Sequence, residues 1–371
     1  MQPTLTTGAS GLDIRWADGT LGTFPYLWLR DSDPAGFHPE TGERAFDLTR
    51  IPLDTKPRAA EIQEEALILT WPDTDQPSRF PLDWIRANRP GRVRPDPAAL
   101  APVQWRAELG ARGLPSWPAR EIAESDGGLC AWLAETKSYG LSLVTGLDDD
   151  PEAGMAIAAR IGHLRETNFG RIFEVMTKPD PNNLAYTSEA LPLHTDLTNQ
   201  DLPPGYQFLH CLANDATGGG SVFCDGFAVA TDLRVADREA FAFLSRVTVP
   251  FRFQDGDTDI RSRKTVIGLS DAGVPVEICF NGHLADILDI APEEMAAFYR
   301  AYRLFMAMTR DPAYCVTHRL SRGEMVVFDN RRVLHGREAF DPATGFRHLR
   351  GCYVDRGELD SRLRVLHRDD G

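Results

Sequence analysis

Short strand-like runs fill the first part of the chain. Residues 12–16 alternate apolar and polar side chains, which is typical of a strand with one buried face, and residues 66–71 form a second apolar run. The turn formers Ala17-Asp18-Gly19 and Pro72-Asp73 follow these runs. We therefore predict a small, mostly β domain over residues 1–95.

A proline-rich stretch comes next. Six prolines lie between Pro90 and Pro118, and proline interrupts both helices and central strands. We predict a linker over residues 96–120, and hence a second domain over residues 121–371.

The pattern after residue 121 predicts many short strands and few helices. Helices are expected near residues 129–133, 151–163, 230–244 and 292–309. Strands are expected at 140–146, 183–186, 207–212, 221–224, 247–253, 276–280, 315–319, 324–328 and 347–354. This pattern favours a mainly β fold with flanking helices, built as a double-stranded β-helix, or jelly roll. The helix near 292–309 would pack on the barrel or contribute a dimer contact.

Composition narrows the choice of partners. The net charge of −14 argues against a nucleic-acid partner, which would require a basic surface. No apolar run is long enough to span a membrane, and residues 1–8 do not resemble a secretory signal. The six cysteines form no CxxC pair and are expected to be reduced, so we predict a cytoplasmic protein.

Candidate metal ligands occur in His194-Thr-Asp196. If this segment is a strand, both ligand side chains point to the same face. Such a triplet is common by chance, but His335 follows a predicted strand far along the chain, and Arg347 comes twelve residues later. Two imidazoles and one carboxylate can form the facial triad that holds non-haem Fe(II), and a guanidinium can bind a carboxylate with two hydrogen bonds.

Several further motifs carry a family resemblance. They are Trp28-Leu-Arg-Asp31, Thr70-Trp-Pro-Asp73, Asn182-Asn-Leu-Ala-Tyr186, His194-Thr-Asp196, Gly218-Gly-Gly-Ser-Val-Phe-Cys-Asp-Gly226, His335-Gly-Arg337 and Arg347-His-Leu-Arg-Gly-Cys-Tyr353. Together they span nearly the whole chain, which resembles the γ-butyrobetaine and trimethyllysine hydroxylase family of Fe(II)/2-oxoglutarate dioxygenases.

The resemblance implies roles for the candidate residues. His194, Asp196 and His335 would bind Fe(II), and Arg347 with Ser221 would hold 2-oxoglutarate. With O₂, the enzyme would hydroxylate a C–H bond and release succinate and CO₂, with ascorbate as a possible auxiliary. Members of this family tend to be homodimers, so a homodimer is expected by analogy.

Substrate selection is implied for a second set of residues. An aromatic cage around a trimethylammonium group would consist of Phe169, Phe173, Tyr186 and Tyr353, and the alternative is that these are ordinary core aromatics. The anionic end of the substrate would meet Asn183 and Asn281. Whether Arg171 and His283 also reach the pocket is open from sequence.

Three interpretations of function remain at this stage. The first is hydroxylation of a small trimethylammonium zwitterion, either γ-butyrobetaine or 2-(trimethylammonio)ethylphosphonate. The second is the same chemistry on trimethyllysine or another small acid. The third is a non-catalytic, cupin-like binding protein. The intact set of candidate ligands argues against the third.

The N-terminal domain departs from the family in one respect. Related domains carry a structural zinc bound by three cysteines and a histidine, but residues 1–129 contain no cysteine. We therefore predict that structural zinc is absent. A weaker alternative is a site for a hard metal ion formed by Asp33, His38 and Asp75. Without zinc the domain must rely on its own core, to which we assign Trp16, Trp28, Trp71 and Trp84.

Overall fold

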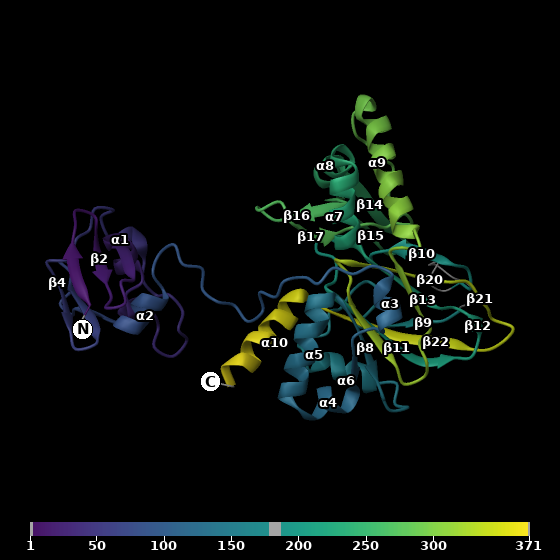
Figure 1. Ribbon diagram of the computed structural model, residues 1–371, viewed down its shortest axis with the longest axis horizontal. Helices are drawn as coiled ribbons and strands as arrows, with labels where there is room; N and C mark the ends of the chain where they lie inside the picture. The colour runs from purple at the N-terminus through teal and green to yellow at the C-terminus, as the bar shows by residue number, and fades with distance from the viewer. Residues whose placement is uncertain (1–2, 178–186, 370–371) are drawn as a thin grey trace. The chain divides into compact units, whose positions relative to one another are not determined.

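The computed structural model describes residues 3–177 and 187–369. The chain divides into two compact units, residues 1–96 (unit 1) and 97–371 (unit 2). Figure 1 shows both units and labels most of their strands and helices.

Unit 1 contains two antiparallel three-stranded sheets. The first sheet consists of β1 (Thr4–Thr7), β2 (Gly11–Arg15) and β3 (Leu21–Pro25), and the second of β4 (Ala59–Gln63), β5 (Ala66–Thr70) and β6 (Ser78–Pro81). Each sheet is followed by a short helix, α1 (Tyr26–Asp31) or α2 (Leu82–Ala87), and two 3₁₀ turns lie at Pro34–Gly36 and Leu48–Arg50. Trp71 is fully buried and Trp16 nearly so, whereas Trp84 is 37% exposed. Strands β2 and β5 correspond to the strand runs expected at residues 12–16 and 66–71.

A buried polar network ties the parts of unit 1 together. The Arg30 guanidinium lies 2.8 Å from an Asp73 carboxylate oxygen and 3.5 Å from Asp33. Ser78 donates a hydrogen bond to Asp33 and accepts one from the Trp71 indole at 2.7 Å. Because Arg30 and Asp33 are both buried, each depends on the other for compensation of its charge.

The weaker alternative of a metal site at Asp33, His38 and Asp75 finds no support in the part of the chain described. These side chains do not gather, since the group of metal-ligating side chains found in residues 3–177 and 187–369 lies in unit 2. The ring of His38 instead accepts hydrogen bonds from the backbone of Glu40 and Thr41 in a turn.

Unit 2 is built on two larger sheets that face each other. The six-stranded sheet has the order β7 (Ser116–Pro118), β8 (Leu141–Thr145), β19 (Met325–Asp329), β11 (Tyr206–Asn214), β22 (Arg347–Val354) and β9 (Ile172–Val175). The four-stranded sheet has the order β10 (Leu191–His194), β20 (Val333–Arg337), β13 (Ser221–Asp225) and β18 (Cys315–His318). Among the described strands of these two sheets, β7 and β8 pair in parallel and the other pairs are antiparallel. Two facing antiparallel sheets are the jelly-roll arrangement that the sequence predicts.

Further elements complete unit 2. Three antiparallel strand pairs are β12 (Thr217–Gly218) with β21 (Phe340–Asp341), β14 (Thr248–Gln254) with β15 (Asp259–Thr265), and β16 (Ile267–Leu269) with β17 (Pro275–Ile278). The helices are α3 (Glu108–Arg112), α4 (Ala119–Glu124), α5 (Asp126–Tyr139), α6 (Ala153–Ala159), α7 (Gly226–Ala236), α8 (Arg238–Arg246), α9 (Pro292–Arg310) and α10 (Arg356–Asp369).

Three apolar layers hold unit 2 together. Helices α4, α5, α6 and α10 cover the outer face of the six-stranded sheet, and Figure 1 shows them gathered on one side of the barrel. Helices α7, α8 and α9 cover the outer face of the four-stranded sheet. The layer between the sheets includes Leu209, Phe223, Phe328 and Leu349. Helix α9 therefore packs on the barrel, through Phe298, Ala301 and Phe305 among others.

The boundaries differ from the sequence expectations in three places. Of the linker expected over residues 96–120, residues 97–120 are grouped with unit 2, where the Trp105 ring is buried. The single helix expected near 230–244 is two helices, because Asp237 leaves the helical conformation and its carboxylate accepts from the Ala240 amide to start α8. His335, expected to follow the strand at 324–328, lies inside a further strand, β20, and β20 belongs to a different sheet from β19.

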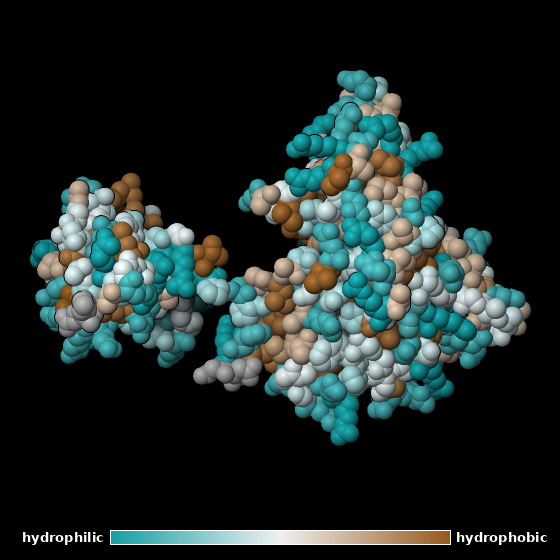
Figure 2. All heavy atoms as spheres, viewed as in Figure 1, coloured by the Kyte–Doolittle hydropathy of each residue, from teal (hydrophilic) through white to brown (hydrophobic). Residues whose placement is uncertain are grey.

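With 25% charged residues, the chain is expected to have a mainly hydrophilic surface. In Figure 2 the visible face of each unit is mainly hydrophilic, with hydrophobic residues in scattered groups. No helix among the described residues is long and apolar enough to cross a membrane.

Candidate active site

Strand alternation directs one set of side chains into the space between the two sheets. Successive residues of a strand point to opposite faces, so Arg347, Leu349 and Tyr353 of β22 share one face. All three line a cavity of about 320 Å³, whereas Cys352 and Val354 pack under the helices on the other face. The same alternation turns residues of β9, β11, β13 and β20 toward this cavity.

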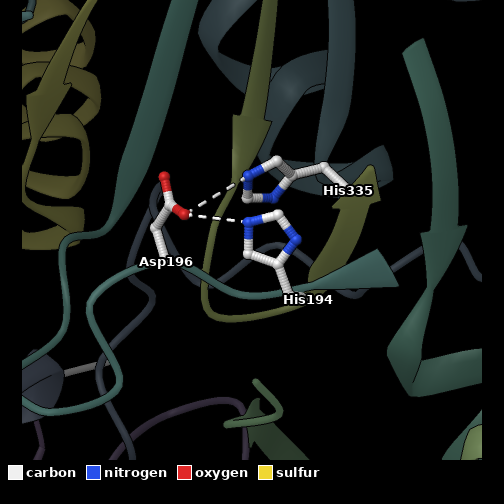
Figure 3. A group of neighbouring side chains, drawn as sticks. All are labelled: His194, Asp196 and His335. Carbon is white, nitrogen blue, oxygen red and sulfur yellow. Dashed lines mark hydrogen bonds and ion pairs between the residues drawn. The ribbon is translucent and has the colours of Figure 1, made fainter. Parts of the chain in front are cut away.

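The candidate metal ligands meet at this cavity. His194 at the end of β10 is the direct cross-strand partner of His335 in β20, and Asp196 follows two residues after His194. One Asp196 carboxylate oxygen, Oδ1, lies 3.1 Å from Nε2 of His194 and 3.6 Å from Nε2 of His335 (Figure 3). The three side chains, expected from sequence to form one site, therefore converge on one point.

The surroundings of Asp196 and His335 favour the protonation states that metal ligands need. Burial alone would raise the pKa of Asp196, but the neighbouring His335 and His194 rings outweigh it and hold the pKa well below the usual range. Burial, with the adjacent His194, lowers the pKa of His335 and favours the neutral imidazole. The Nδ1 atom of His194 lies 2.8 Å from the Pro192 carbonyl, which leaves Nε2 directed at the shared centre.

A buried asparagine fixes the backbone at Asp196. The Asn330 side-chain oxygen accepts from the Asp196 amide at 2.6 Å, and its nitrogen donates to the carbonyls of Asp196 and Pro204, both at 3.1 Å. Asn330 lies in the corner between β19 and β20, and it is fully buried. Nothing in the sequence pointed to Asn330, because its hydrogen-bond partners are more than one hundred residues away along the chain.

Two arginine side chains give one end of the cavity a positive charge. Arg347 and Arg337 both line it, and each guanidinium lies over the Phe340 ring, at 5.6 and 5.0 Å respectively. Burial, with Arg337 nearby, lowers the pKa of Arg347 to about 10, so the group is still charged at neutral pH. Its Nε atom is buried and has no hydrogen-bond partner among residues 3–177 and 187–369. A buried cation of this kind is suited to a bound anion.

The glycine-rich turn forms part of the same end. Ser221 begins β13 and lines the cavity, as the sequence expectation for 2-oxoglutarate requires. Gly218 and Gly219 have φ values of 85° and 72°, which residues with a side chain rarely adopt. A Cβ atom at Gly219 would lie 3.1 Å from the Arg347 side chain, so the turn leaves space for that arginine.

Aromatic side chains form another wall of the cavity. The rings of Phe173 and Tyr353 are stacked with centroids 5.0 Å apart, and Phe169 also lines the space. Phe253, which sequence reasoning missed, stands edge-on to Phe169 at 5.3 Å. Two further residues predicted for substrate binding, Tyr186 and Asn183, lie outside the described residues.

The residues expected near the anionic end of the substrate divide into two groups. Asn281 and His283 line the cavity, whereas Arg171 is exposed and is not among the described residues that line it. The Asn281 side chain donates to the Thr195 carbonyl at 3.0 Å and accepts from the amides of His283 and Leu284. Asn281 therefore ties the metal-ligand segment to the segment that carries His283.

Gln207 is a second lining residue that sequence reasoning missed. It is 3% exposed, and its amide oxygen has no hydrogen-bond partner in the part of the chain that the structure describes. Its direct cross-strand partners are Tyr353 in β22 and Phe328 in β19. Its only signal in the sequence is its position in an apolar strand, where a polar residue is unusual.

The donor sets fit the groups that the family requires. Two imidazoles and one carboxylate within reach of one ion are the ligand set of non-haem Fe(II) oxygenases. The buried Arg347 guanidinium, with an unpartnered Nε, fits a carboxylate co-substrate.

Comparisons with known proteins agree with this geometry. Residues 106–353 match the family model of the taurine catabolism dioxygenase TauD, TfdA family, and residues 4–86 match that of the gamma-butyrobetaine hydroxylase-like N-terminal domain. A crystal structure of AAD-2 in complex with Mn(II) and N-oxalylglycine has the same fold, with a TM-score of 0.51. It is 14% identical and covers 63% of this chain and 92% of its own.

Two relatives match almost the whole chain. The gamma-butyrobetaine dioxygenase of Pseudomonas sp. (strain AK-1) is 41% identical over 364 residues, covering 97% of this chain and 94% of the relative. The mitochondrial trimethyllysine dioxygenase of Gallus gallus is 31% identical over 365 residues, covering 96% and 86%.

The fold and the His-Asp-His site thus define an Fe(II)- and 2-oxoglutarate-dependent dioxygenase that uses O₂. The chain belongs to the γ-butyrobetaine and trimethyllysine hydroxylase family of these enzymes. The alternative of a non-catalytic binding protein is therefore set aside.

Proposed function

We propose that this enzyme hydroxylates an unactivated C–H bond of a small trimethylammonium zwitterion, with γ-butyrobetaine as the first candidate. The observation that carries the proposal is the aromatic wall of Phe169, Phe173, Phe253 and Tyr353 in the cavity that also holds the His-Asp-His site. A quaternary ammonium cannot donate an N–H hydrogen bond, and aromatic faces attract it electrostatically. The similarity to a gamma-butyrobetaine dioxygenase supports the same substrate class.

Each group of cavity residues has a separate task in this proposal. His194, Asp196 and His335 would hold Fe(II), which with 2-oxoglutarate and O₂ supplies the chemistry that inserts one oxygen atom into a C–H bond and releases succinate and CO₂. Arg347 would bind the far carboxylate of 2-oxoglutarate, and the Ser221 hydroxyl would donate a further hydrogen bond. The aromatic wall would orient the substrate and exclude water from its cationic end.

The anionic end of the substrate bears on the choice between a carboxylate and a phosphonate. The described donors near the aromatic wall include the Asn281 amide and the His283 ring, while the exposed Arg171 does not line the cavity. A phosphonate has more charge and one more oxygen than a carboxylate, and it would favour a cationic partner. We therefore rank γ-butyrobetaine, which would give carnitine, above 2-(trimethylammonio)ethylphosphonate.

A succinate-release assay with three substrates tests this proposal. γ-Butyrobetaine, 2-(trimethylammonio)ethylphosphonate and trimethyllysine are each supplied with Fe(II), 2-oxoglutarate, ascorbate and air. We expect kcat/KM to be highest for γ-butyrobetaine. If only trimethyllysine stimulates succinate release, γ-butyrobetaine is not the substrate. If none of the three compounds stimulates succinate release, the proposed substrate class is wrong.

A matched pair of variants locates the binding site. Phe253→Leu removes an aromatic face but keeps an apolar side chain of similar volume, so it should raise KM for the ammonium substrate. The loss of one cation–π contact corresponds to about 0.5–2 kcal/mol, or roughly 2- to 30-fold. Leu284→Met, at another lining position, changes no aromatic face and serves as the control. Equal effects of both variants would contradict the role of the aromatic wall.

A further inference from the structure

Tyr353 belongs to the substrate wall and to the metal site at once. Its ring stacks on Phe173 with an interplanar angle of 30° and lines the cavity. Its hydroxyl donates a hydrogen bond to Oδ2 of Asp196 at 2.7 Å. A single rigid side chain thus connects the surface expected to meet the substrate cation with a carboxylate expected to meet the metal.

The two oxygens of Asp196 therefore have different surroundings. Oδ1 is the atom nearest to Nε2 of both His194 and His335, and Oδ2 is the atom held by Tyr353. A carboxylate fixed in this way presents one oxygen to the centre of the site. Keeping the second oxygen away preserves the open positions that a facial triad leaves for other ligands.

The fold fixes the Tyr353 ring from the side of Phe173. Gly351, two residues before Tyr353, is the direct cross-strand partner of Phe173. A Cβ atom at Gly351 would lie 2.4 Å from the Phe173 ring, so the ring occupies space that only a glycine leaves open. Phe173 can therefore lie across β22 and stack on Tyr353, which restricts the direction of the hydroxyl.

We propose that Tyr353 is a positioning residue that couples substrate binding to the metal site. This inference rests on the proposed trimethylammonium substrate. A cation against the Tyr353 ring holds the ring in place, and the fixed hydroxyl then holds the Asp196 carboxylate in the orientation that the metal needs. Substrate and metal then each favour the binding of the other, by the same factor in both directions.

The variant Tyr353→Phe separates the two roles, because it keeps the ring and removes only the hydroxyl. Mn(II) serves as the probe, and electron paramagnetic resonance of the free ion measures its affinity with 2-oxoglutarate present. We expect Tyr353→Phe to bind Mn(II) about 10- to 100-fold more weakly, as for other losses of a partner to a metal ligand. Its affinity for γ-butyrobetaine, measured by calorimetry, should change by less than about 3-fold if the ring makes most of that contact.

The coupling itself is read from a second titration. Addition of γ-butyrobetaine should tighten Mn(II) binding to the wild type, and this increase should be lost in Tyr353→Phe. Phe169→Leu, which alters the wall without touching Asp196, should weaken γ-butyrobetaine binding and leave the Mn(II) affinity measured without substrate unchanged. An Mn(II) affinity in Tyr353→Phe equal to that of the wild type, with and without substrate, would overturn the inference. Failure of the wild type to bind any of the three ammonium substrates would instead overturn the proposed function.

Discussion

His194 and His335 face each other directly across the antiparallel strands β10 and β20, with ring centroids 4.4 Å apart. More than one hundred residues separate them in the chain, so the strand register alone brings them together. A shift of register by one residue would turn one imidazole away from the other. The metal site is therefore a consequence of how the four-stranded sheet is paired.

Replacement of His335 by Ala should abolish activity through loss of metal. One of three ligands is removed, so Mn(II) affinity should fall by more than the roughly 100-fold seen for losses of outer partners. Metal titration followed by electron paramagnetic resonance measures this. His318→Ala, in the edge strand β18 that pairs with β13, is a control that leaves the three ligands intact. Metal affinity retained in His335→Ala would exclude this histidine as a ligand.

Arg347→Ala should raise the 2-oxoglutarate requirement. Loss of one partner of a buried charge pair typically costs about 2–5 kcal/mol of binding, so the apparent KM should rise at least roughly 30-fold. Initial rates of succinate formation at varied 2-oxoglutarate give this value. The exposed Arg322, paired with Asp149 on the surface, provides the control variant Arg322→Ala. An unchanged KM in Arg347→Ala would place the co-substrate elsewhere.

Gly351→Ala should disturb the aromatic wall without touching the metal ligands. The added methyl group meets the Phe173 ring, which must then leave its place on Tyr353. We expect KM for the ammonium substrate to rise by about 2- to 30-fold, while the 2-oxoglutarate requirement stays the same. Gly357 has open space around its Cβ position, so Gly357→Ala should leave both values unchanged. Wild-type kinetics in Gly351→Ala would show that the position of Phe173 does not matter.

Asn330→Ala should weaken both the fold and the metal site. The substitution leaves buried backbone groups at Asp196 and Pro204 without partners, at a cost of about 1–3 kcal/mol for each group. Urea unfolding should show this loss, and Mn(II) affinity should fall in parallel because Asp196 is no longer held. Asn88→Ala, whose side chain bonds to a single carbonyl in unit 1, is the matched control. Full stability together with full metal affinity would contradict the role of Asn330.

Arg30→Ala should destabilise unit 1, where we predict no structural zinc. Asp33 would remain buried without its cationic partner, which typically costs about 3–5 kcal/mol. Differential scanning calorimetry of the full chain should show a lower Tm for one transition. The exposed pair of Arg79 with Glu64 supplies the control Arg79→Ala, for which little change is expected. A chelator that lowered the wild-type Tm of this transition would contradict the predicted absence of zinc.

Local sequence patterns were enough to predict the fold class and to select the candidate site residues that lie within sequence motifs. Short strand runs predicted the jelly roll, and the spacing of His194 and Asp196, with the distant His335 and Arg347, led to residues that the structure places around one cavity. The fold-class prediction is confirmed, and these side chains share a cavity because strand alternation is a local property.

Features that depend on non-local pairing could not be predicted. Asn330 and Gln207 acquire their positions from strands far away in sequence, and Phe253 meets Phe169 only in the folded barrel. The change of sheet between β19 and β20 left no signal in the turn residues, which suit a hairpin equally well.

The central claim is that the cavity around His194, Asp196 and His335 hydroxylates a trimethylammonium substrate. Mass spectrometry of γ-butyrobetaine after incubation with the enzyme, Fe(II), 2-oxoglutarate and O₂ tests it most directly. The account predicts a product that has gained one oxygen atom, formed in equal amount to succinate and absent with His335→Ala. Recovery of unchanged γ-butyrobetaine while succinate accumulates would contradict it.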